Sequence, residues 1–529
     1  MRYGLTKSYP NLTCFMRFFC LFALLVLFNL PVVSSQENQK IEPYWELLFN
    51  NRRKEALTKF EKRQKQDIQD QLIHEILKSE DGTFTNPDGF IKEISSYPDF
   101  EYYLYGLWNQ NFFFDTYLST GFNKKNSKNI NGIDLNLVKN PTVKESLRYL
   151  KSAVAQQNDD WETYYKLNTQ IPAIKKWQFC GSFENLNGSG LATEYGPEKN
   201  AVSKTEFSAN SNGFVNWYTS EGRKKEAYQY YSNHAEYGSA VNYAQTFITN
   251  PQARKAVIRF GSSALAKVWL NDVLVYENIN DGITDMDAYS VSVNLPEGNN
   301  RLLVKNADKT GIPYFIVRIT DAEGKAITDL KYDPVYAAYN KSTVESVNPK
   351  TLIHPIEAFF SNKLKQEPND FFSAFCLVNT YLRNSKYTEA KAILLPLLKT
   401  YPNSSFLRKY LIDSYTKEKD YTSAKELQKN IENDDEGHYL SYIYQFQDTG
   451  KLFKLPVQEF EKFMATFSEA TDMELLKKSA ALMASLRKED KAAVKENLKV
   501  ITEEHKDQLN ILKIYLNIYS SYLNEDDRA

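Results

Sequence analysis

The spacing of hydrophobic residues changes twice along the chain and divides it into three regions. Over 36–175, apolar side chains such as Leu72, Ile76 and Leu77 recur at steps of three and four residues. This period matches one face of an α-helix, so the spacing predicts a region of helical hairpins. The stretch 123–136 is rich in Asn, Lys and Gly, and we expect it to be a loop between helices.

Between 176 and 331 the period falls to two, which predicts β-strands. The clearest strand segments are 256–260, 266–270, 289–293, 301–305 and 314–319. Turn-forming residues separate them, including Asn271-Asp272, a pair that can form a type I′ hairpin turn. Short strands at this spacing, without helices between them, indicate an antiparallel β-sandwich. We expect a linker over 332–352.

Helical spacing returns over 353–529, and here the sequence repeats. The residues that mark two successive units are Tyr381, Tyr387, Ala390 and Pro402, followed by Tyr415, Tyr421 and Ala424. Corresponding tyrosines and alanines are 34 positions apart. A period of this length predicts stacked helix pairs, each covering the apolar face of its neighbour, and therefore an α-solenoid.

Two of these regions resemble known families. The segments 386–390 and 420–424 resemble the tetratricopeptide-repeat motif, with alanine at the close-packing position. The segments 177–185, 260–275 and 295–305 look like strands of a galactose-binding-like jelly roll. The expected fold is therefore multidomain α + β, with tetratricopeptide-like helical hairpins flanking an antiparallel jelly roll.

This combination is similar to the N-terminal half of large bacterial envelope proteins that carry a DUF3857 domain and a transglutaminase-like domain. The resemblance covers roughly 175–330 well and 350–430 as generic repeat, and it stops before any transglutaminase-like Cys, His and Asp. It therefore implies an architecture and gives no catalytic residues. Whether the chain is a shortened version of such a protein stays open.

The N-terminus has the features of an export signal. Arg17 precedes an apolar run over 18–28, and Pro31 and small residues follow it. We expect cleavage after Ser35, so that residues 1–35 form a signal peptide.

Export would place the mature protein in the periplasm or outside the cell. A translation start at Met16 fits this signal better than Met1, because the residues before Met16 are unusually polar. The alternative is an uncleaved membrane anchor, but the apolar run is shorter than the roughly 20 residues that a spanning helix needs. After cleavage we expect no membrane span.

Charge and cysteine content exclude several classes of protein. The chain has 65 Lys and Arg against 66 Asp and Glu, so no basic excess is present to neutralise a nucleic acid. Of four cysteines, Cys14 and Cys20 lie in the signal. Cys180 and Cys376 lie among apolar residues, and we expect both to be buried free thiols, not nucleophiles.

The search for catalytic residues gives none. The densest acidic loop contains Asp281, Asp285 and Asp287, which could hold a structural Ca²⁺ or form a solvated turn. We expect no other cofactor. A second acidic run, 434–436, is expected to be exposed between helices.

An aromatic and polar segment is the other candidate site. Its residues are Trp217, Tyr218, Tyr228, Tyr230, Tyr231, His234 and Tyr237. Sugar rings stack on aromatic faces while their hydroxyls need polar partners, so this segment could bind carbohydrate. The competing interpretation is that these tyrosines pack inside the sandwich.

The sequence therefore favours a non-catalytic binding or scaffold protein of the cell envelope. Its repeat surface would bind a protein or peptide partner, and its sandwich a glycan or protein. The alternative is a substrate-positioning part of a transglutaminase-like or glycan-processing enzyme system. A purely structural spacer is a third possibility.

Overall fold

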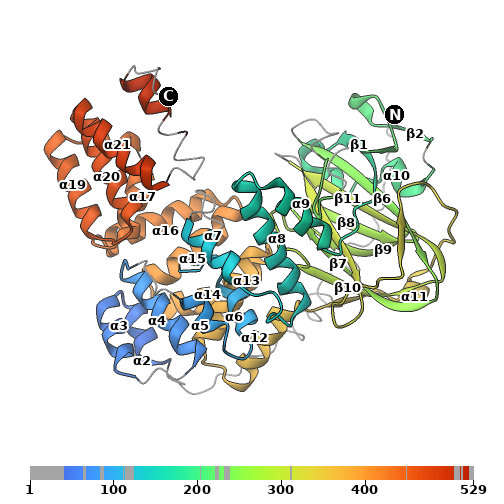
Figure 1. Cartoon of the computed structure of the whole chain (residues 1–529), viewed down its shortest axis with the longest axis horizontal. Coiled ribbons are helices and arrows are strands. Elements are labelled where there is room, and N and C mark those ends of the chain that lie inside the picture. Colours follow the sequence, from blue (N-terminus) through green and yellow to red (C-terminus); the bar gives the residue numbers. More distant parts are fainter. Residues whose placement is uncertain are drawn as a thin grey trace, which may run out of the picture. The chain divides into compact units, whose positions relative to one another are not determined.

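The computed structural model describes most of the chain after the predicted signal peptide, which itself lies outside the described residues. The described residues are 41–63, 67–83, 89–110, 112–113, 124–202, 204–220, 225–231, 239–309, 313–447, 449–505, 513 and 516–523. Residues 42–529 form one compact unit of mixed α and β structure with antiparallel sheets (Figure 1).

Helices precede the first long strand, as the hydrophobic spacing predicts. They are α2 Pro43–Phe49, α3 Arg53–Glu61, α4 Ile68–Glu80, α5 Phe90–Ile94, α6 Phe100–Leu107, α7 Lys124–Gly132, α8 Pro141–Gln157 and α9 Trp161–Gln170. Asp67, Asn140 and Asp160 cap α4, α8 and α9, each accepting a hydrogen bond from a backbone N–H of the first turn. These caps explain why the three helices begin where they do.

The prediction of a loop over 123–136 is wrong, because α7 lies within that stretch. Its Asn and Gly residues have weak helix propensity. Ile130 at the end of α7 and Ile133 just beyond it are buried, and α7 packs on α8. Burial of these isoleucines stabilises a helix that local composition does not favour.

Two antiparallel sheets follow. The larger has the order β4-β1-β6-β11-β8-β9, with β13 also paired to β6, and the smaller has the order β14-β10-β7-β12-β5. The strands are β1 Gln178–Glu184, β4 Tyr218–Thr219, β5 Gln229–Tyr230, β6 Ala240–Asn250, β7 Arg254–Ser262, β8 Leu265–Leu270, β9 Val273–Asn278, β10 Tyr289–Leu295, β11 Gly298–Asp308, β12 Tyr314–Thr320, β13 Lys331–Asp333 and β14 Lys350–Leu352. A separate short pair joins β2 Glu206–Ser208 to β3 Phe214–Asn216.

The two sheets share one hydrophobic core. Alternate residues of β8 and β11, such as Val268 and Val304, pack in the same buried cluster as Phe260 of β7 and Val291 of β10. This is the arrangement that a period of two predicts for strands with one buried face. The β8–β9 hairpin turns at Asn271 and Asp272 with φ of 51° and 68°, which confirms the predicted positive-φ turn.

The sequence predicted a linker over 332–352, but this segment contains two strands and a short helix. Its first residues complete β13, which pairs with β6, and its last residues form β14, which pairs with β10. Between them lies the short helix α11 Val344–Val347, whose Val347 is buried in the shared core. The residues 178–352, hereafter the two-sheet unit, therefore include the expected linker.

Helices return after β14, and each packs on the next along most of this region. They are α12 Pro355–Gln366, α13 Phe371–Arg383, α14 Tyr387–Thr400, α15 Ser405–Lys417, α16 Tyr421–Asp434, α17 Tyr439–Gln447, α18 Thr449–Leu452, α19 Val457–Glu469, α20 Glu474–Arg487 and α21 Lys491–His505. The starts of α13 and α15 are 34 residues apart, as are those of α14 and α16. The helix boundaries thus follow the sequence period in these two pairs.

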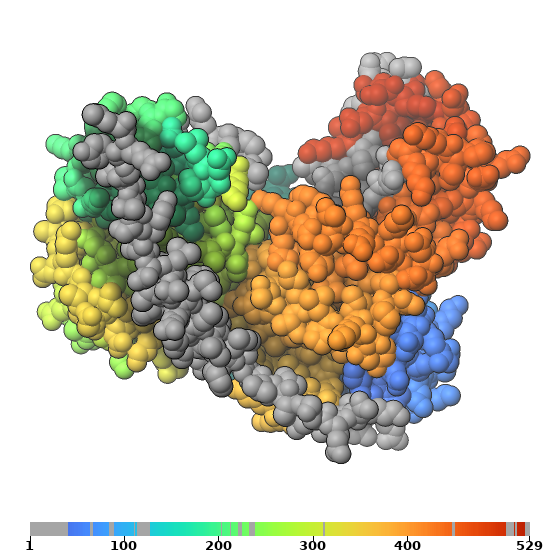
Figure 2. Space-filling view, turned by 180° about the vertical axis from the view of Figure 1, so that it is seen from behind, coloured from blue at the N-terminus to red at the C-terminus, as the bar shows by residue number. Residues whose placement is uncertain are grey.

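Aromatic side chains join the first helices to the later ones. The ring of Phe371 lies 4.9 Å from that of Trp45 and 4.8 Å from that of Phe49, measured between centroids. Gly106 of α6 approaches α12 and α13 so closely that an added Cβ would lie 3.1 Å from atoms of both Cys376 and Phe360. The N-terminal helices therefore lie beside α12–α15 (Figure 2, blue beside orange).

Buried polar contacts join the two-sheet unit to the helices. Asp287 accepts hydrogen bonds from Arg318 at 2.5 Å and from Thr142 of α8 at 2.9 Å. Asp285 accepts one from Nε of Arg383, at the end of α13, at 2.9 Å. These contacts fix α8 and α13 against the same loop of the sheets. Within the described part of the chain, no helix is both long and apolar enough to cross a membrane.

We expect Trp45→Ala to lower the free energy of unfolding by about 3–5 kcal/mol, because it leaves a large cavity between the N-terminal and later helices. Urea unfolding followed by circular dichroism measures this change. The control is Trp161→Ala on α9, where the side chain is 46% exposed and we expect a loss below about 1 kcal/mol. Equal losses in the two variants would show that the first helices are not part of the core.

Candidate functional site

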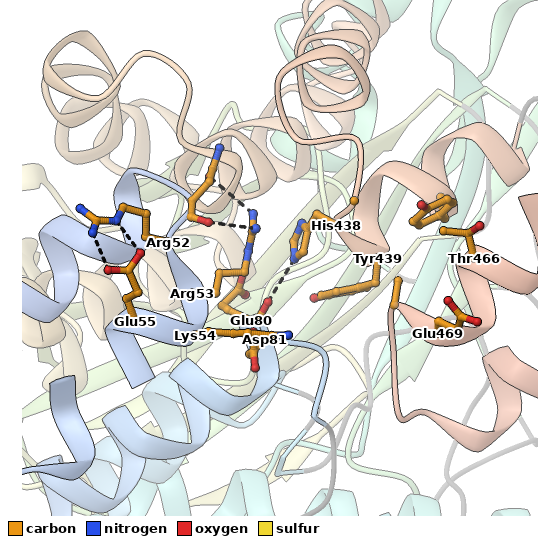
Figure 3. Close-up of a pocket in the computed structure, with 14 residues that line it drawn as sticks. Arg52, Arg53, Lys54, Glu55, Glu80, Asp81, His438, Tyr439, Thr466 and Glu469 are labelled. Carbon is orange, nitrogen blue, oxygen red and sulfur yellow. Dashed lines mark hydrogen bonds and ion pairs between the residues drawn. The ribbon is translucent and has the colours of Figure 1, made fainter. Parts of the chain in front are cut away.

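A pocket of about 610 Å³ lies where the N-terminal helices meet the later ones (Figure 3). In the close-up, residues of α3 and α4 face residues of α17 and α19 across it. The lining residues are Asn51, Arg52, Arg53, Lys54, Glu55, Glu80, Asp81, Gly437, His438, Tyr439, Tyr442, Thr466, Glu469 and Ala470. The pocket is thus built from segments far apart in the sequence.

Asn51 holds the first of these segments in place. Its φ of 61° is in the left-handed region, which asparagine tolerates better than most residues. Its side chain donates to the carbonyl of Asn403 at 2.8 Å and accepts from the N–H of Ser405 at 3.0 Å. These bonds tie the start of α3 to the start of α15, so the three basic residues after Asn51 are presented at the pocket.

Arg53 forms an ion pair with Asp435 at the end of α16. Both guanidinium Nη atoms donate to the carboxylate, Nη1 at 3.1 Å to Oδ1, and each side chain is 11% exposed. Two-point pairing of this kind fixes geometry as well as charge. The expectation that 434–436 is an exposed acidic run is therefore wrong for Asp435, because a distant arginine covers it.

Glu80 forms a second buried connection. Its side chain accepts from Lys409 at 2.9 Å, and its backbone carbonyl accepts from Nε2 of His438 at 3.1 Å. Burial opposes the charge of Lys409, but Glu80 raises the pKa of this amine well above its usual value. Burial lowers the pKa of His438 well below 6.5, and the charges of Arg53 and Lys409 lower it further. His438 is therefore neutral, with its proton on Nε2.

The rest of the lining is more open and carries both signs of charge. Lys54, Thr466 and Glu469 are exposed, and Asp81 is half-buried. Burial raises the pKa of the Asp81 carboxyl, and Lys54 and Arg53 oppose that shift. Tyr439 adds an aromatic wall, and burial raises the pKa of its hydroxyl to about 12. The pocket thus offers cations, carboxylates and aromatic surface to a ligand.

The titratable side chains of this lining are of Arg, Lys, Asp, Glu, His and Tyr residues. The described lining residues include neither serine nor cysteine. Cys180 and Cys376 are buried free thiols, and burial raises the pKa of both. Comparison with protein-family models gives no match, and no curated protein matches the chain significantly.

The aromatic residues predicted to bind sugar do not form one group. Trp217 is buried in a cluster with Phe207, whereas Tyr231 is buried between the sheets and Tyr218 packs against that second cluster. Tyr228 and Tyr230 lie elsewhere, beside Tyr149 of α8 and Tyr314 of β12. The other two predicted residues, at positions 234 and 237, lie outside the described residues.

The three predicted calcium ligands each face a different basic side chain. Asp281 pairs with Lys419 at 2.7 Å, and Asp285 and Asp287 pair with Arg383 and Arg318. Among the residues that the structure describes, no group of three or more His, Cys, Asp or Glu side chains could hold a metal ion. Calcium binding stays a prediction.

The predicted repeat residues have unequal environments. Ala390 and Ala424 are buried, as the predicted close-packing role would require, and Tyr387 is buried too. Tyr421, the counterpart of Tyr387, is 57% exposed. The remaining predicted repeat residues are the half-buried Tyr381 and Tyr415 and the exposed Pro402.

The sequence pointed to none of the pocket residues as a site. The available signals were the basic run 52–54 and a histidine beside the acidic run 434–436. Neither run indicates that the other lies nearby, because only the tertiary fold brings Arg53 to Asp435. Spacing along the chain carries no such information.

We expect His438→Gln to reduce the acid sensitivity of folding. A neutral buried histidine binds its proton more readily in the unfolded chain, so stability is full above pH 6.5 and falls as the pH drops. One such histidine contributes a loss of about 1 kcal/mol between pH 8 and pH 5.5. Urea unfolding at the two pH values should show a loss smaller by that amount in the variant.

The difference in free energy of unfolding between variant and parent at pH 8 is the control. At this pH the difference reports only the lost hydrogen bond to Glu80. His354, which is also buried with a pKa lowered by desolvation, remains in both proteins. An unchanged difference between pH 8 and pH 5.5 would contradict a neutral His438.

Proposed function

We propose that this chain is an exported, non-catalytic binding protein of the cell envelope, and that the pocket between α3–α4 and α17–α19 receives a segment of a partner protein. The observation that carries the proposal is the pocket itself, about 610 Å³ in volume and assembled from distant segments. Its export rests on the signal-like N-terminus.

We further propose that the later helices are tetratricopeptide-like and that the two-sheet unit is a galactose-binding-like jelly roll. The 34-residue spacing of helix starts and the burial of Ala390 and Ala424 support the first assignment. Two antiparallel sheets around a common core support the second.

The packing of the N-terminal helices limits where a partner can bind. In a helical-repeat protein, the surface offered to peptides is formed by stacked helices. Here α2 and α6 already cover parts of α12, α13 and α15 with aromatic contacts. The pocket lies beyond this covered part, between the start of α3 and the end of α4 on one side and the start of α17 and the end of α19 on the other. It is therefore an uncovered region of the described helical surface at which a partner can bind.

The lining fits an extended peptide with charged side chains of both signs. Lys54 supplies a cation at the edge, and Asp81 and Glu469 supply carboxylates. Tyr439 and Tyr442 supply aromatic surface, which is enriched at protein interfaces. The ion pairs of Arg53 and Glu80 hold the walls in position before a ligand arrives.

A photo-crosslinking amino acid at Thr466 tests the proposal. In envelope extract we expect it to give a discrete protein adduct, which Glu469→Arg in the same chain should reduce at least several-fold. The matched control places the same amino acid at Lys429, an exposed residue of α16 outside the pocket. Adducts of equal yield at both positions, or none at Thr466, would contradict a docking site here.

Mass spectrometry of the adduct also separates this proposal from the alternative. A transglutaminase-like or glycan-processing enzyme, or its substrate, captured at Thr466 would favour a substrate-positioning role.

A further inference from the structure

A second, smaller cavity lies between α8 and the two-sheet unit. Its volume is about 170 Å³, and its lining residues are Trp108, Ser146, Tyr149, Leu150, Ala153, Tyr228, Ile283, Thr284, Asp285, Met286 and Tyr314. Ile283 is 60% exposed, whereas Trp108 and Met286 are 1% and 2% exposed. The cavity therefore runs from the surface to the buried core.

Aromatic rings form much of its wall. The ring of Tyr228 lies 4.6 Å from that of Tyr149 and 5.7 Å from that of Tyr314, measured between centroids. The indole of Trp108, which is buried, also lines the cavity. Aromatic faces of this kind pack well against the C–H faces of a sugar ring.

Polar groups lie among these rings. The hydroxyl of Ser146 has no hydrogen-bond partner within the described residues, although the residue is only 5% exposed. A buried polar group without a partner is costly, so the site favours a ligand or water that can bond to it. Asp285 adds carboxylate oxygens, which can accept hydrogen bonds from hydroxyl groups.

The charge of the lining favours a neutral ligand. Asp285 carries a negative charge, but Arg383 pairs with it at 2.9 Å. The same guanidinium lies 5.0 Å from the centre of the Trp108 ring, so a cation of the protein already uses that aromatic face. A cationic ligand would have to compete with Arg383 for both partners.

The volume limits the ligand to one ring. A cavity of about 150 Å³ in another protein binds benzene, so 170 Å³ leaves room for at most one six-membered ring. From size, aromatic walls, polar groups and neutral charge together, we infer that this cavity binds one neutral sugar residue. This site is separate from the protein-docking pocket, and the inference does not rest on the proposed function.

Ligand-observed NMR with free glucose, galactose, mannose and N-acetylglucosamine tests the inference on the purified full chain. We expect at least one of these sugars to bind with about millimolar affinity, as is usual for so small a ligand. Ala153→Phe, which places a ring in the cavity, should weaken that binding at least tenfold. The matched control is Gln156→Phe, an exposed position on the same helix, which should bind as the parent does.

Ser146→Ala is the second variant, because it removes one hydroxyl and barely changes volume. We expect about two- to tenfold weaker binding, the usual effect of one lost hydrogen bond. Two results would overturn the inference: no sugar in the panel binds the folded parent, or binding survives Ala153→Phe unchanged. If no sugar binds but tetramethylammonium does, the cavity is a cation site instead.

Discussion

The aromatic contact between the first and later helices is the constraint on which the helical part of the structure depends. Trp45 and Phe49 pack on Phe371, and nearby Asn51 bonds to Asn403, 352 positions away. Because these contacts fix α2 and α3 against α13 and α15, they also determine where the helical surface stays uncovered. The pocket lined by Arg53 and His438 lies where the start of α3 and the end of α4 meet the start of α17 and the end of α19.

Much of the secondary structure could be predicted from local pattern. The alternation of apolar and polar residues predicted the main strands of the two-sheet unit, and the pair Asn271-Asp272 predicted the hairpin turn. Similar residues that recur 34 positions apart, such as Ala390 and Ala424, predicted two helix pairs. Prediction failed where tertiary contacts outweighed local preference: burial of Ile130 and Ile133 stabilises α7 in an Asn-rich stretch, and pairing with β6 and β10 orders the expected linker.

The candidate site could not be predicted in the same way. Arg53, Glu80 and His438 belong to segments with no common motif, and only the packing of helices brings them together. The sequence did single out Tyr228, and the structure places it in a cavity wall. Its neighbours there, Tyr149 and Trp108, come from helices that the sequence assigned to a different domain. A site at a junction of domains takes residues from each of them, so no single segment shows its composition.

The interlocking of α2 with α13 and α15 also dictates an order of events during synthesis. A chain made from its N-terminus produces Trp45 and Phe49 long before Phe371 and Phe406, so these rings cannot be buried in their final places until most of the polypeptide exists. Contacts between such distant positions also form slowly. Until then the first helices expose apolar surface, which in a nascent chain favours aggregation.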